Sequence, residues 1–540
     1  MEQSRGARGP RSPHPRLVLL ILLLGVVAIV VTGLSLRSGG IGWDSRYETN
    51  AALASRAVNS DDTLASAYEK VPTNSEFQGV FLYRTADWLH SIRGGTTTGG
   101  SSEYLIPDDS TTYQYQGLVN IVLALIAVTA LAVAIGVALR SVLAGAFAWS
   151  LTLSTPLWLG MSHVDFKDVP VAAGLTMISA GLILSLALKD RSKAITAGVL
   201  LAGAGGALTL SSRAGAMVLI LALAGGTALA AFALAGKERR LAGSKPVLLS
   251  AASAVIFGVF FTWLTNPIAR ISLFTWLWDA FQENRSFPFD GTIRTAGVDV
   301  SSMDIPLWYV PAWLVAQLPL LTLVGLVAAT AWLSVTLNRR RELFRSRAFI
   351  SLTPIVIQGL ILPAFVVLGG AVLYDGIRHL LFMIPALMAV PAIGVALIER
   401  QPPEWIRSAV AIPAACAAVV AFSLFASIRW APYSYAFVNP VAGLDKDAWE
   451  IDYWGVSGRE GVTRLRDMGL DQVRIRPNVD NGIPFGGAVT NGPLGSDQET
   501  GLYEFIRGPE RAADLGCEVV FEIKRDGQLL GEGARCPPGS

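Results

Sequence analysis

Long runs of apolar residues, separated by short polar segments, fill most of this chain. Each run is about twenty residues long, the length that an α-helix needs to cross the hydrocarbon core of a bilayer. The pattern therefore predicts a polytopic α-helical membrane protein with about eleven transmembrane helices. We expect these helices at residues 17–36, 117–139, 141–160, 169–188, 194–211, 215–236, 247–264, 311–336, 348–370, 380–398 and 408–428.

The basic residues of the polar segments predict how the helices are oriented. They gather before the first helix and in alternate loops, with about 19 on that side against about 6 in the short loops opposite. Because basic loops stay in the cytoplasm, residues 1–16 are expected to be cytoplasmic. The loops at 37–116 and 265–310 and the tail at 429–540 would then lie outside the cytoplasm, with 17–428 as the transmembrane domain.

Composition agrees with this class and argues against others. Of the 540 residues, 52% are hydrophobic and 16% are charged, and the mean hydropathy is +0.48, which is too apolar for a soluble protein. A net charge of +2 argues against nucleic acid as a partner. The sequence has no glycine-rich phosphate loop, dinucleotide fingerprint, zinc spacing or Gly-x-Ser-x-Gly elbow. These absences argue against chemistry with a nucleotide sugar on the cytoplasmic side.

The first long loop carries a different pattern. Residues 77–92 place apolar side chains at helical spacing among aromatic and charged ones, which predicts an amphipathic helix along the membrane surface. Residues 94–102 are rich in Gly, Thr and Ser, and we expect them to form a mobile lid.

The tail mixes helical and strand patterns, which predicts an α/β domain outside the cytoplasm. Residues 458–468 are polar and amphipathic, and residues 472–476 alternate. The Asp-Gly pair at 526–527 is a two-residue turn signal, and a hairpin folded there places Cys517 directly opposite Cys536. Opposed positions lie within disulfide range, so we predict a bond between these cysteines; the alternative is two unpaired thiols. A disulfide would require an oxidising compartment.

Two carboxylates follow the first predicted transmembrane helix. If a helix begins after Gly42, Asp44 and Glu48 are four residues apart and lie on one face, with nothing basic between them on that face. One interpretation is structural: Asp44 caps the helix, and Glu48 suits the helix dipole in the first turn. The other is that the pair takes part in chemistry at the membrane surface.

The short link before the fourth predicted helix is dense in ionisable residues: His163, Asp165, Lys167 and Asp168. Asp168 precedes a Val-Pro pair, so a role as a helix cap can explain it. Capping does not explain the other three. Because polar groups near the bilayer are costly, we predict a functional role for at least one of them.

Arg378 and His379 are expected to open a helix, where the positive end of the helix dipole disfavours cations. An anionic headgroup held by backbone N–H groups and by Arg378 would remove this conflict, and Arg213 would be a second phosphate contact. The alternative is that these side chains extend to ordinary lipid phosphates.

Five blocks lie at the expected external ends of the helices. They are Asp44 with Glu48; Ser-His-Val-Asp-Phe-Lys-Asp-Val-Pro at 162–170; Pro-Leu-Trp-Tyr-Val-Pro at 306–311; Tyr-Asp-Gly-Ile-Arg-His-Leu-Leu-Phe at 374–382; and Asn439-Pro440 with Asp452-Tyr453-Trp454-Gly455. Together they resemble the GT-C membrane glycosyltransferases, in particular the bacterial dolichyl-phosphate-mannose protein mannosyltransferases and aminoarabinose transferases. The resemblance covers most of the chain, and its most specific part is the Tyr-Asp-Gly-x-Arg-His block. It departs from the group at Asp44-Ser45, where the group has an adjacent Asp-Glu pair.

The resemblance implies transfer of a sugar from a polyprenyl-phosphate donor, with inversion, to an acceptor hydroxyl. Asp44, alone or with Glu48, would be the general base. Arg378, His379 and Lys167 would stabilise the leaving phosphate. Asp165 and Asp168 would orient the sugar or hold Mg²⁺ or Mn²⁺. The full set of expected substrate-binding residues is His163, Asp165, Lys167, Asp168, Arg213, Tyr374, Asp375, Arg378 and His379.

The expected setting is the bacterial plasma membrane, with membrane lipids as neighbours and a glycan, lipid or protein as the acceptor. Two other functions remain open. A transporter or lipid flippase would also have many spans, although the charges here lie at the external rim rather than at mid-membrane. A catalytically inactive scaffold is the third interpretation, because Ser45 replaces the expected neighbour of Asp44.

Overall fold

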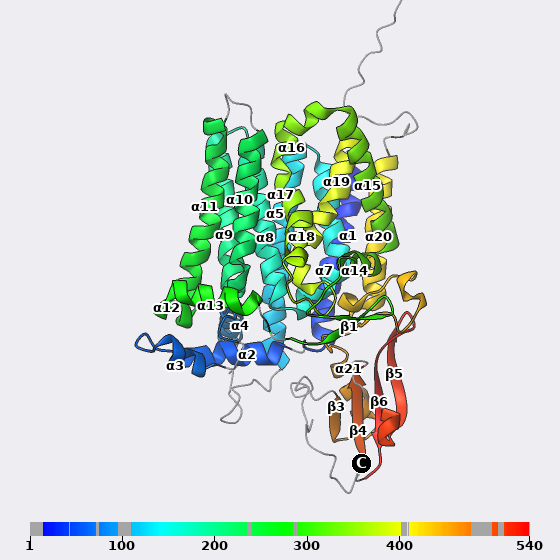
Figure 1. Cartoon of the computed structure of the whole chain (residues 1–540). Coiled ribbons are helices and arrows are strands. Elements are labelled where there is room, and N and C mark those ends of the chain that lie inside the picture. The colour runs from blue at the N-terminus through cyan, green and yellow to red at the C-terminus, as the bar shows by residue number, and fades with distance from the viewer. Residues whose placement is uncertain are drawn as a thin grey trace, which may run out of the picture.

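Most of the helices form one bundle, and smaller elements cover one of its ends (Figure 1). The computed structural model describes residues 14–42, 44–71, 75–94, 110–234, 240–285, 287, 289–400, 408, 410–476, 499–505 and 512–538.

Nine helices of the described part of the chain are long and apolar enough to cross a membrane. They confirm the predicted class, a multi-pass α-helical membrane protein. The helices with such spans are α1 (Pro15–Ser38), α5 (Ser110–Leu139), α8 (Asp168–Ala187), α9 (Arg191–Ser212), α10 (Met217–Leu234), α11 (Arg240–Thr265), α15 (Leu320–Arg339), α19 (Met383–Arg400) and α20 (Ala411–Trp430).

The expected number was about eleven, and the described part of the chain has nine or ten such spans, because the predicted spans at 141–160 and 348–370 do not each form one long helix. The span at 141–160 consists of α6 (Val142–Ser154) and α7 (Pro156–Val164), which meet at 60° and bring the number to ten if they count as one span. Pro156 starts the second helix because it has no N–H to continue the first.

The predicted spans at 311–336 and 348–370 are also divided, but the first still contains a spanning helix. The first divides at Pro319 into α14 (Tyr309–Gln317) and α15. The second consists of short pieces, which are α16 (Arg347–Ser351), α17 (Thr353–Val356), the π-helix Ile357–Ile361 and α18 (Leu362–Leu368). Its apolar part, Thr353–Leu368, is shorter than the nine spanning helices.

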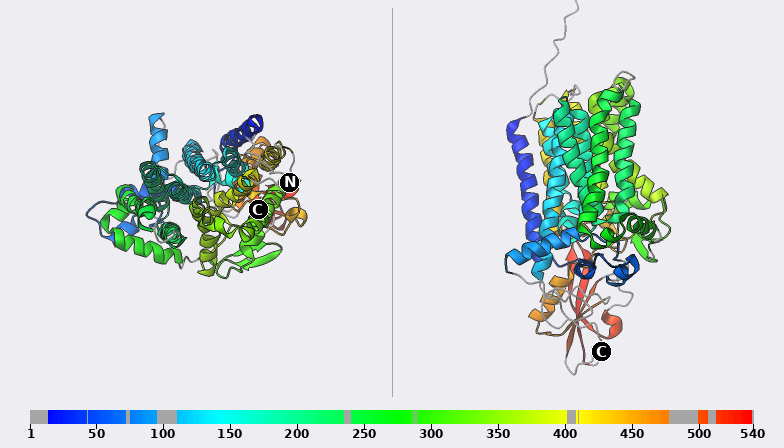
Figure 2. Two further views of the ribbon diagram at one scale, coloured as in Figure 1. Left: turned by 90° about the horizontal axis from the view of Figure 1, so that it is seen from above. Right: turned by 90° about the vertical axis from the view of Figure 1, so that its left-hand side faces the viewer.

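The spanning helices differ greatly in burial. In α8, 94% of the spanning window is buried inside the protein, against 6% in α15. Viewed from above, the helices fall into two groups around a centre (Figure 2). Because α8 is surrounded by protein along its length, its two ends are fixed points of the fold.

Glycines let α9 pack closely against its neighbours α8 and α11. A Cβ atom at Gly174 of α8 would lie 2.6 Å from the carbonyl oxygen of Gly205 in α9. A Cβ atom at Gly206 would lie 1.8 Å from the backbone oxygen of Ala254 in α11. Small residues at such crossings allow backbones to approach and are a general means of helix association in membranes.

We therefore expect Gly206→Ala to lower the thermal unfolding temperature of the detergent-solubilised protein, with a cost of about 1–3 kcal/mol from overpacking. The matched control is Gly225→Ala on α10, where nothing lies within 4 Å of the added atom. There the higher helix propensity of alanine should leave the protein as stable or more so. Equal unfolding temperatures for the two variants would contradict the close α9–α11 contact.

The elements at one end of the bundle come from the segments expected outside the cytoplasm (Figures 1 and 2). We call this the site end; which side of a membrane it faces stays a prediction. Between the spans it carries α2 (Ser45–Ala54), α3 (Leu64–Glu69), α4 (Phe81–Ile92), α12 (Pro267–Ile271), α13 (Leu273–Arg285), and the hairpin of β1 (Thr292–Thr295) and β2 (Val298–Ser301).

The amphipathic helix expected at 77–92 is confirmed as α4, although it starts at Phe81. The preceding residues instead run along the end of α9, where Gln78 forms an isolated β-bridge with Arg213. The expected lid at 94–102 lies, apart from Gly94, outside the described residues. The structure of the 265–310 segment was not predicted from the sequence.

The chain after α20 ends in a four-stranded sheet, which lies beyond the site end (Figure 1). The strand order is β3-β4-β6-β5, and only the β3–β4 pair is parallel. The predicted helix and first strand are confirmed. The elements are α21 (Gly458–Asp467), β3 (Val473–Arg476), β4 (Thr500–Phe505), β5 (Glu518–Arg525) and β6 (Gln528–Cys536).

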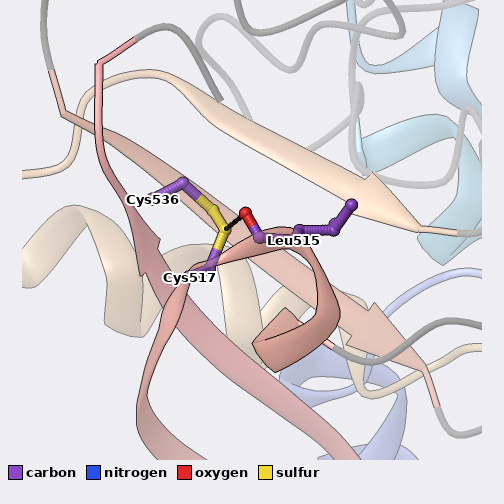
Figure 3. Close-up of a disulfide and its surroundings, with 3 residues drawn as sticks. All are labelled: Leu515, Cys517 and Cys536. Atoms are coloured by element: carbon purple, nitrogen blue, oxygen red, sulfur yellow. Dashed lines mark hydrogen bonds between the residues drawn. A yellow bond between two sulfur atoms is a disulfide. The ribbon is translucent and has the colours of Figure 1, made fainter.

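The predicted disulfide between Cys517 and Cys536 is present, with the two Cα atoms 4.3 Å apart (Figure 3). The β5–β6 hairpin folds at the Asp-Gly turn, but its pairing is not uniform. One register shift in each strand, at Val520 and Leu530, displaces the pairing by one residue in opposite senses. The two shifts cancel, so the two cysteines meet as simple counting from the turn predicts.

Candidate active site

A cavity of about 670 Å³ opens at the site end, where segments far apart in the sequence meet. This volume lies within the usual range for a small-molecule site. Acidic and basic side chains from distant segments thus converge in the fold. The charged and aromatic residues in its wall include Asp44, Lys167, Arg213, Tyr374, Asp375, Arg378 and Trp454.

Asp44 lies between two cations at the start of α2. Its Oδ2 atom is 3.6 Å from Lys167 Nζ and 3.7 Å from Arg378 Nη1. The helix begins at Ser45 as predicted, but the Asp44 side chain makes no capping hydrogen bond. The interpretation of this side chain as a helix cap is therefore wrong. Its side chain is 30% exposed, so the carboxylate is accessible from the cavity.

Glu48 lies one turn further along the same face and is much less accessible. Its side chain is 3% exposed, Lys167 Nζ lies 2.8 Å from Oε1, and the hydroxyl of Tyr83 donates a hydrogen bond to Oε2. The two carboxylates thus share one lysine, as the spacing of four residues allows. Glu48 holds the lysine from the buried side, and Asp44 meets it from the cavity.

These contacts separate the pKa values of the two acids. Burial raises the pKa of Glu48 above its usual range, and Asp44 adds to this effect. Burial alone would also raise the pKa of Asp44, but the charges of Lys167 and Arg378 outweigh it and lower that pKa. Asp44 is therefore ionised at neutral pH. The amine of Lys167 stays protonated, since Glu48 and Asp44 overcome the effect of burial and raise its pKa.

The link between α7 and α8 presents Lys167 to the cavity. Asp165 is fully buried, and its Oδ1 atom accepts hydrogen bonds from the backbone N–H groups of Lys167 (3.1 Å) and Asp168 (2.8 Å). Asn120 donates to the carbonyl oxygen of Asp165 at 2.8 Å. Asp165 rather than Asp168 satisfies the amides at the start of α8, so the expectation that Asp168 is the cap is wrong.

Asp168, the first residue of α8, pairs with arginines instead. Its Oδ1 atom is 2.7 Å from Arg213 Nη1, and its Oδ2 atom is 3.8 Å from Arg378 Nη1. Within the described ranges, no group of three or more His, Cys, Asp or Glu side chains is arranged to hold a metal ion. Asp165 and Asp168 are the residues expected to orient the sugar or to hold Mg²⁺ or Mn²⁺, and this role stays a prediction.

Arg378 is the most enclosed cation of the site. The turn before it uses left-handed backbone at Asp375 (φ 57°) and Gly376 (φ 68°), after which η6 (Arg378–Leu380) begins. The Arg378 side chain is 2% exposed and lies 3.2 Å from Asp375 Oδ2. Its guanidinium carbon is 4.7 Å from the ring centroids of both Tyr374 and Trp454. Two cation–π contacts and the carboxylates fix this group in place.

Because carboxylates of the protein lie beside Arg378, a bound anion is not needed to balance its charge. Burial would lower its pKa, but Asp375, Tyr374, Asp168 and Asp44 raise it, so the group is permanently charged. Even so, its Nε and Nη1 atoms are buried and make no hydrogen bond with any residue that the structure describes.

His379 and His163 differ from their expected roles. Burial, followed by the charge of Arg378, lowers the pKa of His379 well below its usual value, so this ring is neutral. It packs edge-on against Tyr374 with 4.6 Å between the ring centroids. His163 is buried in α7, with its Nε2 atom 3.2 Å from the carbonyl oxygen of Pro432. Neither histidine lines the cavity.

Several cavity residues were not predicted as site residues. Tyr453 and Trp454 come from the chain after α20, and Phe287 and Phe289 from the segment between α13 and β1. Phe289 stacks on Tyr374 at 4.1 Å between centroids. The available signal was the Asp-Tyr-Trp-Gly block at 452–455, quoted for the resemblance but given no role.

Asp452 anchors the turn that carries Trp454. The turn has left-handed backbone at Asp452 (φ 52°) and Gly455 (φ 64°). Asp452 accepts hydrogen bonds from the backbone N–H of Val456 (3.1 Å) and from the hydroxyl groups of Tyr435 and Ser457. Burial raises the pKa of Asp452 to about 6, with the Ser457 hydrogen bond opposing it.

The hydrogen-bond network around Asp452 extends into the C-terminal sheet. Tyr503 of β4 donates a hydrogen bond to the Ser457 hydroxyl at 2.7 Å. A chain of contacts thus connects the C-terminal sheet with Arg378 in the cavity.

Fold and site together define the class: a multi-pass membrane protein with the GT-C fold of membrane glycosyltransferases, as the sequence resemblance predicted. The solved structure of ArnT, an aminoarabinose transferase, from Cupriavidus metallidurans bound to undecaprenyl phosphate is similar with a TM-score of 0.51 and 12% sequence identity. The match covers 95% of this chain and 97% of that one. An Archaeoglobus fulgidus oligosaccharyltransferase also matches, with a TM-score of 0.43, 13% identity, and 87% and 60% of the two chains covered. No protein-family model and no curated protein matches this sequence.

Proposed function

We propose that this protein transfers a sugar from a polyprenyl-phosphate donor to an acceptor hydroxyl, with inversion at the anomeric carbon. The observation that carries the proposal is the Asp44 carboxylate, which is open to the cavity and lies between the charged groups of Lys167 and Arg378. A base beside two cations is what attack on a sugar with a phosphate leaving group requires.

The donor phosphate binds to the cations of the cavity wall. Arg378 offers N–H groups without hydrogen bonds, and Lys167 and Arg213 are partly exposed. The bond between the anomeric carbon and the phosphate oxygen breaks, and its electron pair stays on the phosphate. Because charge grows on that oxygen during the reaction, fixed cations stabilise the transition state more than the bound donor. The occurrence of undecaprenyl phosphate in the ArnT structure supports this choice of donor.

Asp44 accepts the proton of the acceptor hydroxyl as the oxygen attacks from the side opposite the phosphate. A carboxylate with a lowered pKa is a weak base, but the donor phosphate changes its surroundings. The phosphate competes with Asp44 for Lys167 and Arg378, so the pKa of Asp44 rises when the donor binds. A positioned base of this kind contributes about 100- to 10,000-fold to the rate.

The acceptor is a glycan, a lipid or a protein on the extracytoplasmic side of a bacterial plasma membrane. This location follows from the excess of basic residues in the loops at the end of the bundle away from the site. No step of the proposed reaction uses a metal ion.

The test is an assay with the purified protein in vesicles that contain polyprenyl-phosphate sugars. A transferase releases free polyprenyl phosphate only when an acceptor is present, and the sugar appears on the acceptor. A transporter or flippase would move the donor across the bilayer with the sugar still attached, which overturns the proposal. Donor binding without release or movement, over a broad panel of sugars and acceptors, would indicate an inactive scaffold.

We expect Trp454→Leu to weaken donor binding by about 2- to 30-fold, because one face of Arg378 loses its cation–π contact. Trp454→Phe keeps an aromatic ring there and should retain most of the affinity. The KM for the donor measures the effect, and Trp88→Leu on α4, whose ring is exposed, is the control. An unchanged KM in Trp454→Leu would mean that the C-terminal segment does not contribute to the site.

A further inference from the structure

A second cavity, of about 710 Å³, lies at the other end of the bundle. It is formed where α5, α8 and α19 end and α6 and α16 begin. α8 connects the two cavities: this helix of 20 residues begins at Asp168 in the candidate site and ends at Ala187 in the second wall. At 1.5 Å per residue the two lie about 30 Å apart, the thickness of a bilayer core.

The charge of this cavity is strongly unbalanced. Among the residues that the structure describes, four cations line it and Glu399 is the single carboxylate in its wall. The Glu399 carboxylate already accepts a hydrogen bond from the hydroxyl of Ser141. The cations are Arg140, Lys189, Arg347 and Arg400.

Two of the cations have structural partners. Arg347 donates hydrogen bonds to the carbonyl oxygens of Leu186 (2.6 Å) and Leu188 (2.5 Å), at the end of α8. Arg400 donates to the carbonyl oxygen of Leu139, at the end of α5 (2.5 Å). The last carbonyl groups of a helix have no partner within it, so these contacts explain both arginines.

Arg140 and Lys189 have no such explanation. Both are exposed, and neither makes an ion pair or side-chain hydrogen bond with any residue that the structure describes. Arg140 also has left-handed backbone (φ 47°), where glycine or asparagine is the usual residue after a helix. An arginine at this position strains the backbone, which indicates a function for its side chain.

One part of the wall is apolar. Val137, Ala138, Val142 and Ala187 line the cavity beside the cations, and Val137 and Val142 are exposed, Val142 by 73%. A free inorganic anion would gain nothing from this surface. A molecule with a negative headgroup and a hydrocarbon chain fits both parts of the wall.

We propose that this cavity binds the headgroup of an anionic phospholipid from the leaflet at that end of the bundle. Arg140 and Lys189 contact the headgroup phosphate, and the acyl chains lie against the exposed apolar side chains of α5 and α6. By the distribution of basic residues this leaflet is the cytoplasmic one, whose anionic lipids attract such clusters. The proposal does not depend on the reaction at the site end.

The experiment measures lipid binding to the full-length protein by native mass spectrometry and by thermal unfolding in detergent. Phosphatidylglycerol should bind and raise the unfolding temperature, whereas phosphatidylcholine should not. In the double variant Arg140→Gln/Lys189→Gln, affinity for phosphatidylglycerol should fall about 10- to 30-fold, since each basic residue contributes about a factor of five.

Two further variants distinguish a specific lipid-binding site from general electrostatic attraction of anionic lipids to basic residues. The charge-preserving variant Arg140→Lys/Lys189→Arg should retain binding. The double variant Arg339→Gln/Arg340→Gln, at the end of α15 and outside the cavity wall, should bind as the wild type does. Equal loss in both Gln variants, equal affinity for the two lipids, or full displacement by inorganic phosphate would overturn the proposal.

Discussion

Replacement of Asp44 by asparagine is expected to reduce sugar transfer by about 100- to 10,000-fold, the usual contribution of a positioned base. Asparagine has nearly the same shape but cannot take up the acceptor proton. It also removes one negative charge beside Lys167 and Arg378, so the donor phosphate should bind as well or better. The measurement is kcat with saturating donor, together with the KM for the donor.

The control for this variant is Asp304→Asn, an exposed acid at the same end that does not line the cavity. Glu48→Gln tests the role of Glu48 separately from that of Asp44. It leaves Asp44 in place but weakens the contact that holds Lys167, so it should raise the donor KM more than it lowers kcat. If Glu48→Gln lost as much kcat as Asp44→Asn, the two carboxylates would act together as the base. An active Asp44→Asn enzyme would remove Asp44 from the mechanism.

The second large effect is expected for Arg378→Gln. This side chain is 2% exposed and lies near the carboxylates of Asp375, Asp44 and Asp168. Its loss removes the buried cation that these carboxylates share, and breaking a buried ion pair typically costs about 3–5 kcal/mol of stability. We expect a lower thermal unfolding temperature in detergent and no measurable donor binding.

Arg213→Gln is the matched comparison, because Arg213 is 28% exposed and pairs only with Asp168 among the carboxylates of the described chain. It should weaken donor binding with little change in unfolding. Arg378→Lys restores the charge but not the flat group between Tyr374 and Trp454, so it should recover stability better than affinity. A stable Arg378→Gln protein that binds donor normally would contradict the assigned arrangement.

The sequence predicted the features that depend on local spacing. Asp44 and Glu48 share a helix face because they are four residues apart, and both reach the same lysine. Cys517 and Cys536 meet because the turn between them fixes the register, even though two shifts interrupt the pairing.

Features that depend on contacts between distant segments were missed or misjudged. The sequence argument places a ligand anion at Arg378, whereas carboxylates from its own turn and from two other segments already surround it. The sequence argument treats His379 as a cation, although its charge depends on burial next to Arg378. Fewer spans are found than expected because apolar length alone does not reveal the break at Pro156 or the short helical pieces within 348–370.

The lysine and arginines of the cavity all form ion pairs with carboxylates of the protein itself before any ligand binds. For the proposed reaction this arrangement has a consequence at the end of each cycle. The lipid phosphate product must compete for the cations with these carboxylates, which are always at high local concentration. The carboxylates therefore slow phosphate binding and speed up phosphate release. Turnover then avoids the product inhibition that an uncompensated cluster of cations would impose on so highly charged a by-product.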